Sequence, residues 1–232
     1  MDDLDKKFFF IIHSMYYDFH VLSEDNQIIY ENKIFHDGLD IKNNSIHIKK
    51  FLDENIFKIE KKFKIYIKDI YLILNDKDLI SINVSLIKDF ERLSSDYSVI
   101  QGDLSIIKES VLKSNLDFEL VHMVISKFII DKKDYFELPE DINQKSLFLE
   151  IKLICLKKEK LIDLKKILAN YQISIKKILN YEYINSFKTD QIEHLSILAS
   201  KLMNGLNKNE INFKKRRSKN IGFFEKFFKF LS

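Results

Sequence analysis

The stretch Phe118-Glu-Leu-Val-His-Met-Val-Ile-Ser-Lys-Phe-Ile-Ile130 carries apolar residues on both faces of an extended chain. Its β-branched and aromatic residues predict a long strand that is covered on both sides. The run 147–156, Leu-Phe-Leu-Glu-Ile-Lys-Leu-Ile-Cys-Leu, has the same character. Pro139 lies between the two runs and marks a loop. The middle of the chain therefore predicts a pair of strongly apolar strands.

Further strands are predicted on the N-terminal side of this pair. The ranges 67–74 and 80–87 are both apolar enough for strands. Phe8–Leu22 and Gln27–Ile34 are rich in β-branched and aromatic residues, and the polar residues 23–26 between them supply a turn. These two ranges are therefore predicted to form a β-hairpin.

Helical periodicity alternates with the strands along the chain. Asn43-Asn44-Ser45 can cap a helix, and the apolar residues that follow repeat at helical spacing: Ile48, Phe51, Leu52, Ile56, Ile59 and Phe63. Three more helices are expected, one capped by Asp103 and ending at Leu112, one over 161–171, and one over 192–206. Residues 173–181 alternate as a further strand. The mixture predicts an α+β fold.

Composition argues against an enzyme that binds nucleotide in the usual way. The 232 residues include only 4 Gly and 1 Pro, whereas a phosphate-cradling loop needs Gly for positive φ and close backbone approach. Neither a Walker A motif nor a Rossmann fingerprint occurs, and the six histidines do not form metal-type pairs. We therefore expect a non-enzymatic protein without cofactor or metal, in which His122 is a satisfied structural histidine.

Cys155, the single cysteine, lies in the apolar run 147–156. It excludes an intramolecular disulfide and is expected to be a buried strand thiol rather than a nucleophile. The acidic start of the chain, and the shortness of the apolar run Phe8–Ile12, argue against a secretory signal. A cytoplasmic protein is expected.

Charge is concentrated at the C-terminal end. From Phe213 onward seven basic residues oppose only Glu225, while the whole chain has a net charge of +3. The basic tail is expected to seek an anionic surface, either lipid headgroups or nucleic acid. Its basic residues are Lys214, Lys215, Arg216, Arg217, Lys219, Lys226 and Lys229.

The last twelve residues predict an amphipathic helix that lies on a membrane. On a helical wheel one half is apolar and the other half holds the lysines and Glu225. The apolar residues are Ile221, Phe223, Phe224, Phe227, Phe228, Phe230 and Leu231. Burying a Phe side chain is worth roughly 1.5–3 kcal/mol, so several partly buried ones give reversible attachment. Docking of this face on the protein's own core or on a partner, and nucleic-acid binding by residues 214–219, are the alternatives.

The tail, Asn220-Ile-Gly-Phe-Phe-Glu-Lys-Phe-Phe-Lys-Phe230, resembles the C-terminal membrane-targeting helix of the bacterial cell-division scaffold FtsA. In that family a Gly-Phe-Phe segment likewise follows a basic linker. A second stretch also resembles this family. It is similar to the family's inserted strand-helix-strand-strand subdomain and comprises residues 119–125, Phe128–Asp131, Pro139 and Leu149-Glu150. Upstream, residues 101–104 are similar to the start of that subdomain's helix.

This resemblance implies a partial actin-like (ribonuclease H-like) unit that carries the inserted subdomain and ends in the amphipathic helix. Actin-like ATPases have an Asp-x-Gly-Thr phosphate loop where this chain has His13-Ser14-Met15-Tyr16, so ATP binding is not carried over. The expected organisation is a partial actin-like unit over 1–97, the inserted interaction subdomain over 98–183, a helix over 184–206, a basic flexible linker over 207–220 and the membrane helix over 221–232.

The function that the resemblance implies is a membrane-tethered scaffold of cell division, at the cytoplasmic face of the cell membrane and at the division site. Its expected partners are an anionic membrane surface and divisome proteins or a second copy of itself. FtsZ binding is left open, and nucleic acid is not expected. The alternatives are an actin-like adaptor of another membrane machine, of the type IV pilus platform type, and an ATPase with a divergent site.

Overall fold

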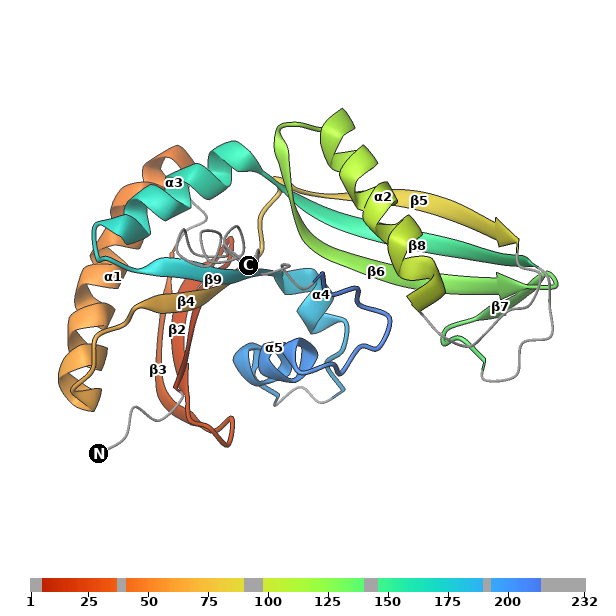
Figure 1. The fold of residues 1–232 in the computed structure, drawn as a ribbon. Helices are drawn as coiled ribbons and strands as arrows, with labels where there is room; N and C mark the ends of the chain where they lie inside the picture. The colour runs from red at the N-terminus through yellow and green to blue at the C-terminus, as the bar shows by residue number, and fades with distance from the viewer. Residues whose placement is uncertain (1–5, 37–40, 90–97, 140–145, 190–192, 214–232) are drawn as a thin grey trace, which may run out of the picture.

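The structure is a computed structural model that describes residues 6–36, 41–89, 98–139, 146–189 and 193–213. The chain forms two β-sheets that lie end to end, each with helices packed on it (Figure 1). The predicted α+β class is confirmed. Among the described residues, the helices are all too short or too polar to cross a bilayer. The membrane helix predicted over 221–232 lies outside the described residues.

The first sheet has five strands in the order β3-β2-β1-β4-β9. Strands β1, β2 and β3 are antiparallel, whereas β4 and β9 run parallel to β1. This mixed sheet, with its first three strands as a meander and the next two reached by crossovers, has the ribonuclease H-like arrangement. The strands are β1 (Lys7–Ile12), β2 (Tyr16–Leu22), β3 (Ile28–Phe35), β4 (Asp69–Leu74) and β9 (Ser174–Asn180).

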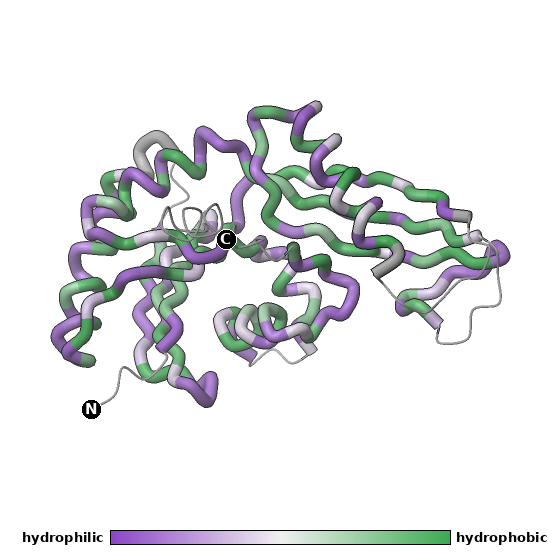
Figure 2. Tube along the Cα trace, viewed as in Figure 1, coloured by the Kyte–Doolittle hydropathy of each residue, from purple (hydrophilic) through white to green (hydrophobic). Residues whose placement is uncertain are grey.

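Helices cover both faces of the first sheet. Helices α1 (Ile41–Phe63) and α3 (Lys158–Ala169) pack on one face, where Phe10, Phe19 and Leu72 point into the core. Helices α4 (Tyr181–Asn185) and α5 (Leu195–Met203) pack on the other face. Because strands alternate between faces, β1 contributes to both cores. In Figure 2 both these strands and the helices that cover them mix hydrophobic and hydrophilic residues.

The second sheet is antiparallel throughout, in the order β5-β8-β6-β7. Helix α2 (Ser98–Ser114) packs on one face through Ile100 and Leu104, which contact Phe128 and its neighbours. The sheet lies between β4 and β9 in the sequence, so it is an insertion in the first unit, as predicted. Its strands are β5 (Leu79–Asp89), β6 (Phe118–Ile130), β7 (Lys133–Tyr135) and β8 (Ser146–Lys157).

Several expected boundaries differ in the structure. Residues 8–22 form two strands, because the chain turns back at His13-Ser14 without Gly, Pro or Asn. Asp103 does not cap α2 but lies within it, in an ion pair with Lys88 of β5. The two sheets also divide the chain differently from the predicted boundary at 97/98: β5 belongs to the second sheet, whereas α3 and β9 return to the first.

Candidate functional site: a groove between the two sheets

A groove of about 370 Å³ lies where the two sheets meet. Strand β6 and helix α2 of the second sheet form one wall, and β9 and α3 of the first sheet form the other. Residues 210–213, which follow α5, lie along the groove between the walls. We call this feature the inter-sheet groove.

The segment 207–213, which was expected to be the start of a flexible linker, is packed along the edge of β6. The Ile125 amide donates to the carbonyl of Asn209 (3.0 Å), and the Ile211 amide donates to the carbonyl of Met123 (2.8 Å). Ile211 and Phe213 pack against the core beneath α2. The segment therefore pairs antiparallel with the part of β6 that precedes its pairing with β7, because its apolar residues pack beside that unpaired edge.

A buried polar cluster fixes this segment. The Glu210 carboxylate accepts hydrogen bonds from His122 Nδ1 (2.9 Å) and from the Tyr183 hydroxyl (3.1 Å). The Lys177 ammonium lies 3.6 Å from the same carboxylate. The side chains of His122 and Glu210 are only 0% and 4% exposed. The cluster thus joins β6, β9 and α4 to the segment that follows α5.

The hydrogen bonds determine the protonation of His122. The Asn180 backbone amide donates to its Nε2 (3.0 Å), so Nδ1 carries the proton that is donated to Glu210. Burial lowers the pKa of His122 in spite of the adjacent carboxylate. Burial alone would raise the pKa of Glu210, but His122, Lys177 and Tyr183 together lower it. His122 is therefore a neutral, satisfied histidine at pH 7, as the sequence predicted.

The groove combines apolar walls with lysines. Its apolar lining includes Val121, Leu161, Ile175 and Ile178. Four lysines also line it, Lys108, Lys165, Lys176 and Lys177, against the two carboxylates of Glu119 and Glu210. The Lys108 ammonium lies over the Phe213 ring, 4.2 Å from its centroid. Such a surface suits an extended chain that presents apolar side chains and negative charge.

Strand β9 lies at an edge of its sheet. In the part of the chain that the structure describes, β9 pairs with β4 on one side only. On its other side it faces β6 across the inter-sheet groove, where both strands contribute lining residues. An edge strand with open backbone groups is a template for adding another strand. The groove therefore has a second edge besides that of β6, which residues 209–211 already occupy.

A second crevice, of about 530 Å³, opens at the carboxyl ends of β1, β4 and β9. In α/β sheets this edge is the usual position for a ligand. Here the β1–β2 turn uses its own amides: His13 N–H donates to the Tyr16 carbonyl and Met15 N–H to the His13 ring. After β4, Asp76 pairs with Lys160 at 2.9 Å, and both side chains are largely buried.

The structure also places the predicted structural cysteine. Cys155 is fully buried in β8, and burial raises the pKa of its thiol to about 11, which confirms the structural thiol. The predicted membrane-binding residues, Lys214 to Leu231, lie outside the described residues. Among the described residues, His20, Glu31 and His194 form a group with metal-ligating geometry, on the α5 face of the first sheet.

Sequence reasoning missed Glu210 as a functional residue. Its partners His122 and Tyr183 lie 88 and 27 positions away, so no local spacing reveals the cluster. One signal was present: Glu210 is the single acidic residue in the otherwise polar and basic range 207–220.

No protein-family model and no curated protein matches the chain. Its fold is similar to a solved structure of the PilM–PilN type IV pilus biogenesis complex, with 9% identity and a TM-score of 0.49 over 78% of this chain and 49% of that chain. The cytoplasmic domain of EpsL, an inner membrane component of the type II secretion system of Vibrio cholerae, shows 10% identity and a TM-score of 0.35 over 81% and 59% of the two chains.

Marinitoga piezophila Argonaute in complex with guide RNA shows 14% identity and a TM-score of 0.24, over 72% of this chain and 26% of that one. The chain thus spans about half the length of the PilM–PilN chain that it matches. At this degree of likeness the comparisons identify neither a family nor a function. The strand order itself shows a ribonuclease H-like unit that carries an inserted second sheet.

Proposed function

We propose that this protein is a non-enzymatic adaptor, held at the cytoplasmic face of a membrane, that binds an extended segment of a partner protein in the inter-sheet groove. One observation carries the proposal: the edge of β6 already accepts the extended residues 209–211, and the edge of β9 faces it across the groove. Strand addition gives affinity through backbone hydrogen bonds, whereas side-chain pockets give selectivity.

The adaptor role without catalysis is supported by the second crevice. A phosphate loop needs backbone amides that point at the ligand. In the β1–β2 turn the amides of His13, Met15 and Tyr16 all donate within the turn. Asp76, two residues after the end of β4, forms a largely buried ion pair with Lys160.

The membrane attachment rests on the amphipathic pattern of residues 221–232. Phe213, at which the basic range begins, lines the inter-sheet groove. The seven residues 214–220 span at most about 25 Å when extended. A membrane helix at 221–232 would therefore hold the groove within that distance of the bilayer, where it meets cytoplasmic segments of membrane proteins.

The chemistry of the groove specifies the partner segment. Apolar side chains would contact Ile175 and Leu161, while acidic side chains would approach Lys165 and Lys176, both of which are exposed. A short, extended, acidic and apolar sequence next to a transmembrane span meets this description. The segment would lie beside β9, in the space that the chain's own residues 210–213 do not fill.

Two kinds of membrane machine fit this role. The resemblance of the tail and of the inserted subdomain to FtsA favours a scaffold of cell division. We place an adaptor of the pilus- or secretion-machine type ahead of it. The similar solved structures are a type IV pilus biogenesis complex and a component of a type II secretion system, which agrees with this order.

Site-specific photocrosslinking in living cells tests the proposal. A photoreactive residue at position 176, on the groove rim, should crosslink one protein through a cytoplasmic segment next to its membrane span. The same residue at position 58, on the exposed face of α1, is the matched control. The identity of the crosslinked protein separates a division machine from a pilus or secretion machine. Equal crosslinking at both positions would contradict binding in the groove.

A further inference from the structure

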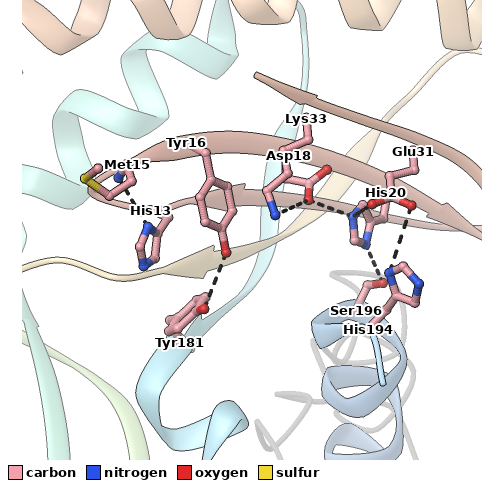
Figure 3. Close-up of polar contacts among 10 residues, drawn as sticks. All are labelled: His13, Met15, Tyr16, Asp18, His20, Glu31, Lys33, Tyr181, His194 and Ser196. Atoms are coloured by element: carbon pink, nitrogen blue, oxygen red, sulfur yellow. Dashed lines mark hydrogen bonds and ion pairs between the residues drawn. The ribbon is translucent and has the colours of Figure 1, made fainter. Parts of the chain in front are cut away.

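A second cluster of polar side chains lies on the face of the first sheet that α5 covers, where β2 and β3 meet the start of α5 (Figure 3). His20 and Glu31 are directly opposite each other in the β2–β3 pair. Asp18 lies two residues before His20, so its side chain points to the same face. His194 immediately precedes α5. The three elements thus converge on four potential metal ligands.

The distances fit a small cation. His20 Nε2 lies 3.0 Å from Asp18 Oδ2 and 3.5 Å from Glu31 Oε1, while His194 Nδ1 lies 4.0 Å from Glu31 Oε2. In a tetrahedral zinc site with bonds of about 2.0–2.1 Å, neighbouring ligand atoms are about 3.3 Å apart. The ligand atoms of His20, Glu31 and His194 all lie within 4.8 Å of one another. Glu31 and His194 are partly exposed and can move the remaining distance.

The buried members of the cluster have unsatisfied atoms. His20 and Asp18 are 2% and 3% exposed, yet Asp18 Oδ1 has no hydrogen-bond partner, and His20 Nε2 makes no hydrogen bond although it lies 3.0 Å from Asp18 Oδ2. Such orphaned buried groups are rare in folded proteins and call for an explanation. A metal ion between Nε2 and the carboxylates would satisfy them together.

The surroundings also suit a metal. His20 Nδ1 lies 2.7 Å from the buried Ser196 hydroxyl, so an Nδ1–H donated to Ser196 leaves the Nε2 lone pair directed at the carboxylates. This is the usual outer support of a metal-bound histidine. The Lys33 ammonium lies 3.9 Å from Asp18 and 3.8 Å from the centroid of the Tyr16 ring, so it keeps its contact with the ring when a dication replaces it as the partner of Asp18.

From this geometry we propose that His20, Asp18, Glu31 and His194 bind one Zn²⁺ ion. Two imidazole nitrogens favour zinc over Mg²⁺ or Ca²⁺. Four protein ligands leave no open position, so the site is structural rather than catalytic. It ties the N-terminal β2–β3 hairpin to α5, the helix that leads to segment 207–213.

Zinc titration of the untagged, metal-free full chain tests this site. One Zn²⁺ should bind per chain and raise the melting temperature, and Co²⁺ should give the visible bands of tetrahedral coordination. His194→Ala and Glu31→Gln, both at exposed positions, should each weaken zinc binding at least tenfold. Ser196→Ala should weaken it by about 10–100-fold, as for other outer-sphere partners.

The control is His47→Ala, which removes an exposed histidine of α1 and should leave zinc binding unchanged. Circular dichroism of each variant in EDTA confirms that it folds without metal. The proposal is overturned if the wild type binds no stoichiometric zinc. It is equally overturned if His194→Ala and Glu31→Gln bind zinc as the wild type does.

Discussion

Replacing Glu210 with Ala should release segment 207–213 from the edge of β6 while the rest of the fold persists. The substitution removes the acceptor of two donors, His122 Nδ1 and the Tyr183 hydroxyl. A buried donor that is left unpaired costs about 1–3 kcal/mol. Lys177 is 29% exposed and can turn to water, so it adds little. For two donors the expected cost is about 2–6 kcal/mol, taken up by local opening rather than global unfolding.

Hydrogen exchange measures this opening directly, because two amides report on it. The amides of Ile125 and Ile211 donate across the junction between β6 and the segment. Since each 1.4 kcal/mol is a factor of ten, their exchange should accelerate by about 30- to 20,000-fold, or to the unprotected rate if that is reached first. The Phe10 amide in β1, at the centre of the first sheet, should keep its wild-type rate.

The matched control is Glu137→Ala. Glu137 makes an exposed ion pair of 3.8 Å with Lys208 of the same segment, and such surface pairs contribute about 0–1 kcal/mol. Exchange at Ile125 and Ile211 should therefore change by no more than a few-fold. Wild-type protection at both amides in Glu210→Ala would refute the view that the buried cluster holds the segment in place.

Three further predictions concern the tail, the nucleotide and pH. Replacing Phe224 and Phe227 with Asp should abolish co-sedimentation with anionic vesicles, whereas high salt should weaken it only partly because burial of Phe is not screened; unchanged sedimentation would contradict the membrane helix. ATP with magnesium should not raise the melting temperature, since a ligand at 100 times its Kd would add about 2.7 kcal/mol; a clear shift would show a functional nucleotide site. Protection of the Ile125 and Ile211 amides from exchange should fall as pH drops, because the pKa values of His122 and Glu210 are both lowered in the folded protein. The loss should begin near the ordinary histidine pKa of about 6.5 and continue below about 4.5, where Glu210 also becomes protonated. Protection that is constant from pH 7 to pH 4 would contradict this prediction.

Sequence periodicity predicted the elements whose burial is strong and regular. Strand β6 was predicted with its observed bounds, because apolar residues follow one another along it and many of them pack in the core of the second sheet. Helix α1 buries Ile48, Phe51, Leu52, Ile56 and Ile59, the residues that share one helical face. Where one element packs against a core along its whole length, the spacing of its apolar residues reveals whether it is a helix or a strand.

The elements that were missed depend on tertiary contacts. The β1–β2 turn is built by the His13 ring and by bonds between His13 and Tyr16, which composition does not reveal. Residues 207–213 look like a linker because their fixed position depends on His122 and on the free edge of β6. The His20–Glu31 pair requires the strand register, and His194 comes from a remote part of the chain.

The tail is expected to attach the protein to the membrane, while the inter-sheet groove selects its partner. Fluorescence microscopy of tagged variants in cells tests these two roles separately. Lys165→Glu/Lys176→Glu, with Lys58→Glu/Lys61→Glu on α1 as the control, should stay on the membrane but spread evenly over it. The control should keep the wild-type distribution. A groove variant that still gathers at the same sites as the wild type would contradict the claim.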